Sequence, residues 1–259
     1  MSQLIRSAKS GSDWTQNDLD SYRIRVEYLD VATFFQIPDL PQPTVRHPAI
    51  LTLSDPANTT DEDVYQFLRG MEQAMLPLDA EESAVDDFAV LLLREVGYAP
   101  LGRIIRTRKD IPLVICGENR HAKTDVCIID DSGILLLVQE DKRHLEGGNP
   151  IPQLIAEAIA AFQSNNVTRE QVLGLPPLHS KVVAGITMKG TAPIFFKIPM
   201  TQELSAAVMG GRYPIVETVV QALLPPIERP SSRLVEGMLP LDNRLRLLSC
   251  YEAFKQFVN

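Results

Sequence analysis

The stretch that decides the fold runs from Thr124 to Lys142 and reads TDVCIIDDSGILLLVQEDK. Its apolar runs at 126–129 and 134–138 have the length and the branched side chains typical of buried strands. The polar cluster 130–133 between them has the composition of a turn, which predicts a β-hairpin. The second run ends in four polar residues, so charged side chains stand where a buried strand leaves its sheet.

Helices are predicted on both sides of this hairpin. Thr60, followed by three acids, predicts the start of a helix that runs to about Met75. Gly97 predicts the end of a second helix over 80–96. Further helices are expected at the following places: 152–164, from Thr201, and 241–257. Other strand signals lie at 104–108, 113–116, 182–188 and 194–198, the last two forming a second hairpin. This order predicts an α/β protein with a mixed central sheet flanked by helices.

The length allows one large domain or two small ones, the composition is that of a globular protein, and we expect a single compact domain. The chain has 259 residues, of which 45% are hydrophobic and 22% are charged. Residues 1–60 are punctuated by prolines and predict an irregular segment that wraps the rest, with one ordered part around 22–35. Residues 61–259 form the predicted α/β domain.

Charge and hydropathy exclude some classes of protein. The net charge of −8 argues against indiscriminate coating of nucleic acid, although it allows a local basic groove. No run of apolar residues is long enough for a membrane span, and residues 1–14 lack the apolar core of a secretory signal. We therefore expect an intracellular protein, nuclear or cytoplasmic, with no membrane partner. The oligomeric state is open, and a homodimer is one option.

The hairpin brings acids together if its register is regular. A tight turn that pairs Asp130 with Gly133 places Asp125 opposite Val138. Glu140 is then the diagonal neighbour of Asp125 on the same face, roughly 7–8 Å away at the backbone. Lys142 shares that face because side chains alternate along a strand. A slip of one residue would separate the two acids between the faces.

Two carboxylates that converge in this way predict a divalent metal site. Asp125 and Glu140 offer hard oxygen ligands with no histidine or cysteine nearby, which favours Mg²⁺ or Mn²⁺ over zinc. Such an ion would activate a water and neutralise a phosphate, while Lys142 would hold the water or the developing charge. Asp141 points to the other face, so it would offer its backbone carbonyl. The competing interpretation is a salt bridge at a strand end that faces solvent.

This arrangement resembles the PD-(D/E)XK nuclease superfamily, which has a restriction-endonuclease-like fold. The match consists of Asp125 with Glu140, Asp141 and Lys142, within roughly residues 80–200. Thr124 stands where the family has a proline. The stretch from Gly117 to Lys142 is also similar to a set of uncharacterised fungal proteins, for which no function is implied.

The resemblance implies further site residues on the flanking helices. Many members of the family add a glutamate from the preceding helix, for which Glu82 is the candidate, with Glu81 close behind and Asp86 and Asp87 weaker. Each is also explained as a helix acid, since acids favour the first turn. Exonuclease-type members carry a glutamine on the following helix, and Gln153 takes that place. Where the family has a tyrosine four residues later, this chain has Glu157. Gln153 and Glu157 also fit the polar edge of an amphipathic helix.

Basic residues cluster around the hairpin in an otherwise acidic chain. The candidates for a groove that follows a phosphate backbone are Arg106, Arg108, Arg120, Lys123 and Arg143. A solvated strand face balanced by Asp110 and Glu118 is an equal alternative. Together these features predict a metal-dependent phosphodiester hydrolase, a nuclease acting on DNA more readily than on RNA. The alternative is a catalytically inactive nuclease-fold module that binds nucleic acid or protein.

Overall fold

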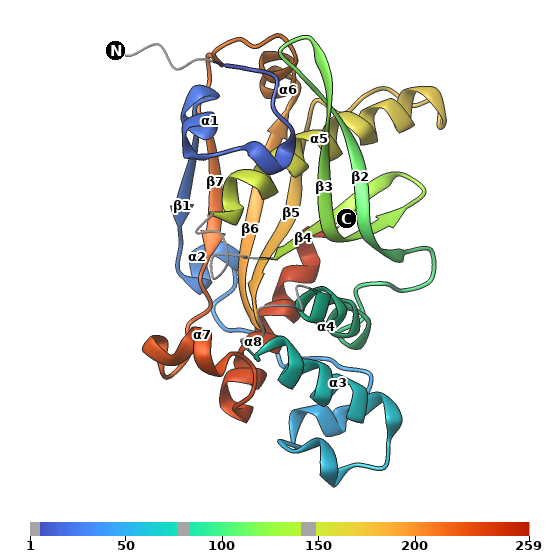
Figure 1. Ribbon diagram of the computed structural model, residues 1–259, viewed down its shortest axis with the longest axis vertical. Coiled ribbons are helices and arrows are strands. Elements are labelled where there is room, and N and C mark those ends of the chain that lie inside the picture. Colours follow the sequence, from blue (N-terminus) through green and yellow to red (C-terminus); the bar gives the residue numbers. More distant parts are fainter. Residues whose placement is uncertain (1–5, 77–82, 141–148, 259) are drawn as a thin grey trace.

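The computed structural model shown in Figure 1 describes residues 6–76, 83–140 and 149–258. Within them the chain forms one mixed sheet with the strand order β1-β7-β6-β5-β4-β3-β2. The strands are β1 (Ile24–Tyr28), β2 (Ile104–Ile115), β3 (Glu118–Asp130), β4 (Gly133–Glu140), β5 (Ser180–Lys189), β6 (Ala192–Thr201) and β7 (Thr218–Leu223). Parallel pairs join β1 to β7 and β4 to β5, and the other neighbours are antiparallel. The prediction of a mixed sheet flanked by helices is confirmed.

Helices pack on both faces of the sheet. They are α1 (Gln16–Ser21), α2 (Val31–Phe35), α3 (Glu62–Ala74), α4 (Ser83–Glu95), α5 (Pro150–Gln171), α6 (Gln202–Met209), α7 (Arg233–Glu236) and α8 (Leu241–Phe254). One core lies between the sheet and α1, α5 and α6, and we call this side of the sheet the α5 face. A second core lies between the sheet and α2, α3, α4 and α8, and we call this side the α4 face. None of the helices in the described residues is both long and apolar enough to cross a membrane.

The decisive hairpin forms as predicted, but its register shifts by one residue. Asp130 pairs with Gly133, as the turn composition predicts. A β-bulge between Ile128 and Ile129 then changes the pairing, so that Val126 rather than Asp125 lies opposite Val138. An extra residue in one strand of a pair causes such a shift. The prediction that Asp125 lies opposite Val138 is therefore wrong.

An asparagine of α5 bonds the backbone of the hairpin beside the bulge. The buried side chain of Asn165 accepts a hydrogen bond from the backbone N–H of Ile134 (2.8 Å) and donates one to its carbonyl (2.8 Å). Gly133 lies beneath this side chain with φ +127°, and a Cβ there would stand 2.1 Å from the Asn165 side-chain oxygen. The helix thus specifies the end of the hairpin through contacts that no local sequence pattern contains.

The two strand signals at 104–108 and 113–116 belong to one long strand, β2. It forms a hairpin with β3 around Gly117, whose φ is +78°. In Figure 1 the tip of this hairpin lies beside α6, and the backbone N–H of Cys116 donates to the carbonyl of Val208 (3.0 Å). The side-chain amide of Gln163 on α5 bonds both the N–H and the carbonyl of Val114 (2.9 and 3.1 Å). Helix α5 therefore supports both hairpins of this half of the sheet.

Other predicted elements differ at their ends. Asp61, not Thr60, caps α3, since its side chain accepts from the N–H groups of Asp63 and Val64. The predicted cap of α6 is confirmed, because the Thr201 hydroxyl accepts from the N–H of Leu204. Helix α5 extends well beyond the predicted 152–164. Strand β7, which is six residues long, was not predicted.

Residues 6–60 are only partly irregular. The ordered part expected at 22–35 contains β1 and α2, and β1 is a strand of the main sheet, so this segment contributes to the sheet as well as wrapping it. A fully buried cation, Arg244 of α8, attaches the part of the segment around residues 50–53 to the rest of the fold. Its guanidinium donates to the carbonyls of Ile50 (2.9 Å) and Leu53 (2.5 Å), and to those of Met238 and Leu239 (both 3.1 Å).

Candidate acidic centre

Asp125 lies where β3 and β4 separate. The ladder between the two strands extends no further than Val126 and Val138. Beyond it, the backbone N–H of Glu140 donates to Asp125 Oδ2 (2.9 Å) instead of to a backbone carbonyl. The Thr124 hydroxyl lies 3.1 Å from the carbonyl oxygen of Val126 and 3.4 Å from that of Val138. Side chains thus replace backbone pairing here, and they fix the carboxylate of Asp125 at the opening between the strands.

A second carboxyl group, that of Glu157, approaches Asp125 from α5. Glu157 is completely buried, and its Oε2 accepts no hydrogen bond from the residues that the structure describes. Burial raises the pKa of Glu157 well above its usual range, and the negative charge of Asp125 raises it further. The polar groups of Gln153 and Thr124 oppose this shift. A buried carboxyl group beside another acid takes up either a proton or a cation, because a lone buried negative charge is costly.

Two glutamines complete the polar surroundings. Gln153 lies one helical turn before Glu157 and donates its side-chain N–H to Glu157 Oε1 (3.2 Å), which orients the carboxyl group. Gln139 on β4 is 2% exposed, and its Oε1 accepts no hydrogen bond within the described part of the chain. A cation with a shell of oxygen ligands would satisfy such buried acceptor oxygens.

Glu140 does not share a face with its predicted partner. On β4, Leu136 and Val138 belong to the core of the α4 face, so the alternation of the strand places Glu140 on that face and Gln139 on the α5 face. The acid that approaches Asp125 on the α5 face is Glu157. The predicted arrangement with Asp125 and Glu140 on one face is therefore wrong, because the bulge introduces the one-residue slip. Glu140 touches the centre through its backbone N–H, and a role for its side chain as a metal ligand stays a prediction.

Several predicted site residues lie outside the described residues. These are Glu81, Glu82, Asp141, Lys142 and Arg143. Their assigned roles stay predictions, including that of Lys142 beside the attacking water.

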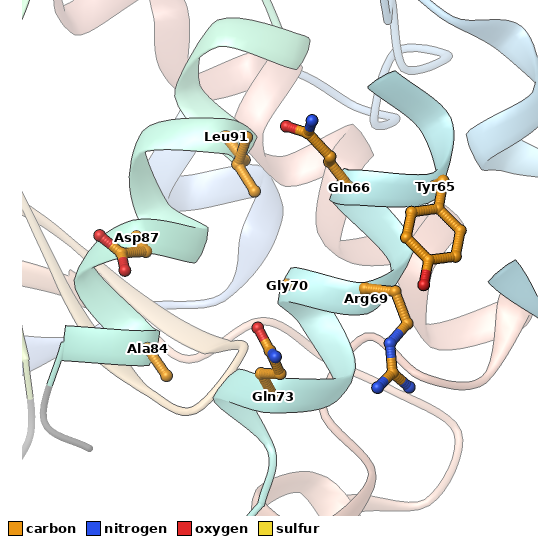
Figure 2. A pocket seen from close by; sticks show the side chains of 8 residues that line it. All are labelled: Tyr65, Gln66, Arg69, Gly70, Gln73, Ala84, Asp87 and Leu91. Atoms are coloured by element: carbon orange, nitrogen blue, oxygen red, sulfur yellow. The ribbon is translucent and has the colours of Figure 1, made fainter. Parts of the chain in front are cut away.

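The weaker acid candidates lie on α4. Asp86 is partly buried there. Asp87 is exposed and lines a separate pocket of about 280 Å³ between α3 and α4, together with Arg69, Gln73 and Leu91. Figure 2 shows Asp87 on α4 across from the side chains of α3. Asp87 therefore belongs to the surface between two helices of the α4 face.

The predicted basic groove is only partly available for phosphates. Arg106, Arg108 and Lys123 are exposed on β2 and β3. Arg120 instead donates to the carbonyl of Ala8 (3.1 Å) and to Glu118 (2.6 Å). Arg108 has the unusual φ of 49° and lies between the pairs Thr107–Val126 and Lys109–Thr124, which places it beside Asp125 on the neighbouring strand. Both strands that flank Asp125 thus depart from regular geometry near this residue.

The sequence alone allows Glu157 to be a residue of a polar helix edge as readily as a site residue. The structure excludes the polar edge, since all residues from Leu154 to Phe162 are buried. The useful signal was present: Glu157 is the one acid in an otherwise apolar helical stretch. A buried acid in such a stretch requires a partner, and the fold supplies Asp125.

A second group of possible metal ligands has a structural explanation. His47, Asp61 and Asp63 lie close together, but both acids are exposed. Asp61 caps α3, and His47 contacts the buried Glu95 (2.9 Å), which raises the pKa of His47. These contacts attach the segment around residue 47 to α3 and α4.

Comparison with known proteins assigns no family to this chain. No protein-family model matches it, and no curated protein matches it either.

Proposed function

We propose that the protein is a phosphodiester hydrolase that depends on Mg²⁺ or Mn²⁺, has a restriction-endonuclease-like core, and acts on DNA more readily than on RNA. Asp125 and Glu157, rather than Asp125 and Glu140, are its central pair of acids. The observation that carries the proposal is the fully buried carboxyl group of Glu157, which faces Asp125 and has an oxygen without a hydrogen bond from the described residues.

The donor atoms fit a hard divalent ion. Asp125 and Glu157 offer carboxylate oxygens, and Gln139 adds a buried amide oxygen on the α5 face. Oxygen ligands of this kind favour Mg²⁺ or Mn²⁺ over zinc. When bound, such an ion supplies a water of lowered pKa and neutralises charge on a phosphate.

The residues of the chain have separate tasks in this scheme. Asp125 is held in place by the N–H of Glu140, and Glu157 by the amide of Gln153, so both acids are fixed before a substrate arrives. The raised pKa of Glu157 favours the protonated carboxyl group when no cation is present. Binding of a cation therefore displaces that proton. The exposed side chains of Arg106, Arg108 and Lys123 are positioned to attract a phosphate backbone.

Cleavage of plasmid and single-stranded DNA with Mg²⁺ or Mn²⁺ tests the proposal. Asp125→Asn and Glu157→Gln should each remove cleavage and the binding of Mn²⁺ measured by calorimetry. Asp131→Asn is the matched control, because Asp131 is an exposed acid in the turn of the same hairpin. If Glu157→Gln cleaves as fast as the unmodified protein, Glu157 is not part of the centre. If the unmodified protein neither cleaves nor binds either metal, the proposal fails.

One observation favours the alternative of an inactive module with a nuclease fold. The bulge places Glu140 on the face away from Glu157, so the side chain of Glu140 does not point towards the acidic centre in the way the resemblance implies. That module would bind nucleic acid or protein without a metal, and Glu140→Ala would leave binding unchanged. Loss of metal-dependent cleavage in Glu140→Ala would exclude it.

A further inference from the structure

A pocket of about 440 Å³ lies on the α5 face, beside the acidic centre. Its walls come from four parts of the fold: the end of β1, the start of α5, strands β5 and β6, and α7 with the residue after β7. The residues that line it are Tyr28, Asn149, Pro150, Ile151, Thr187, Ile194, Leu224, Arg233 and Leu234. A volume of this size lies within the range of small-molecule binding sites.

The pocket and the acidic centre lie along one row of the sheet. Gln139 follows Val138, the partner of Val126, and pairs with Thr187, which in turn pairs with Ile194. Neighbouring strands are about 4.8 Å apart, so the near wall of the pocket lies about 10 Å from Asp125 across two strand spacings. Helix α5 spans the same interval, since its first residues line the pocket and Glu157 lies two turns later.

The lining of the pocket suits a nucleobase better than a phosphate. Pro150 and Pro152 have no N–H, and the side chain of Asn149 already accepts the N–H of Ile151 (3.1 Å). The start of α5 is therefore poor in donors for an anion. The apolar side chains of Ile151, Ile194 and Leu234 instead form walls for a flat ring.

The lining of the pocket also contains an aromatic ring and polar side chains. The ring of Tyr28 is 54% exposed at the pocket, and exposed rings are the surfaces on which bases of single strands stack. Thr187 is a buried polar residue in the same lining and offers a hydroxyl to the edge of a base. The guanidinium of Arg233, also in the lining, donates to the carbonyl of Pro193.

We propose that this pocket binds one unstacked base of a single-stranded nucleic acid whose backbone passes the Asp125–Glu157 centre. The inference rests on the proposed function for its choice of a nucleic acid. It adds a preference for single strands, because a base within a duplex cannot enter such a pocket without leaving its stack.

Binding in EDTA tests this inference without any need for catalysis. The probes are fluorescent oligothymidylate and an abasic oligomer of equal length and charge, followed by anisotropy. We expect oligothymidylate to bind more tightly than the abasic oligomer. Tyr28→Ala should weaken oligothymidylate binding about tenfold and leave the abasic oligomer unaffected, whereas Tyr28→Phe should keep the affinity.

Tyr65→Ala is the matched control, since Tyr65 is 47% exposed and lines the separate pocket between α3 and α4. Equal affinity for the two oligomers, or no binding of either, overturns the inference, as does an equal loss in Tyr65→Ala. Glu157→Gln should retain the difference between the two oligomers. A chain that binds no metal but still distinguishes them would refute the proposed hydrolase and keep the base pocket.

Discussion

Glu157→Gln provides the sharpest test of the acidic centre, because it removes the ionisable proton of one buried group and changes little of its shape. Glu157 is fully buried, and its pKa is raised by burial and by Asp125. In the unfolded chain the same group has a pKa of about 4.3. At pH values between the unfolded pKa and the raised folded pKa, the folded protein holds up to one proton more than the unfolded chain.

The sign of the effect follows from this difference in protons. The stabilising contribution of the protonated carboxyl group is fully present below the unfolded pKa of Glu157, and it is lost as the pH rises towards the raised folded pKa. One proton corresponds to a slope of about 1.4 kcal/mol per pH unit in the free energy of unfolding. The amide introduced by Glu157→Gln cannot ionise. The free energy of unfolding of the variant should therefore rise relative to that of the unmodified protein by up to about 1.4 kcal/mol for each pH unit in that interval.

Urea unfolding at a series of pH values measures this slope. Glu170→Gln is the matched control, because Glu170 is exposed on the same helix. A saturating divalent ion should stabilise the unmodified protein, by about 2.7 kcal/mol at a hundredfold excess over Kd, and should leave Glu157→Gln unchanged. If the unmodified protein and Glu157→Gln show parallel stability curves, Glu157 has an ordinary pKa and the reasoning about the centre is refuted.

Three further predictions concern the scaffold that positions this centre, each measured by urea unfolding. Arg244→Met should cost roughly 3–5 kcal/mol because it leaves four buried or partly buried carbonyls without donors, whereas Arg246→Met, at an exposed position of the same helix, should cost little. A small loss in Arg244→Met would show that water replaces the guanidinium. Asn165→Leu should cost about 2–4 kcal/mol, since the N–H and carbonyl of Ile134 both lose their partner. Gly133→Ala should cost more than about 1 kcal/mol, because its φ is +127° and the added Cβ meets Asn165; unchanged stability would mean that the turn relaxes freely.

The sequence predicted the elements of the fold well where their signals are local. The hairpin around Asp131, the hairpin around Gly190 and the cap at Thr201 depend on residues next to each other in the chain, and all three are confirmed. β7 was missed because it is short, and its pairing with β1 joins distant parts of the chain.

The candidate site was predicted less well than the fold. Asp125 was identified from its place on the hairpin and Gln153 from the resemblance, and the structure brings them together through Glu157. The prediction that Asp125 and Glu140 lie on one face of the hairpin was wrong because it assumed a regular register. A single bulge at Ile128 and Ile129 was enough to exchange the faces.

By itself, the sequence determined an α/β protein with acids at the end of a buried hairpin, because alternation and turn composition are properties of short segments. Only the tertiary structure decided which acids meet. Asn165, which bonds the backbone of Ile134 beside the bulge, is distant from it in the chain, and the partner of Asp125 comes from a helix beyond the hairpin. Contacts of that range are set by how the elements pack together, and a register that shifts by one residue changes the chemistry of the whole centre.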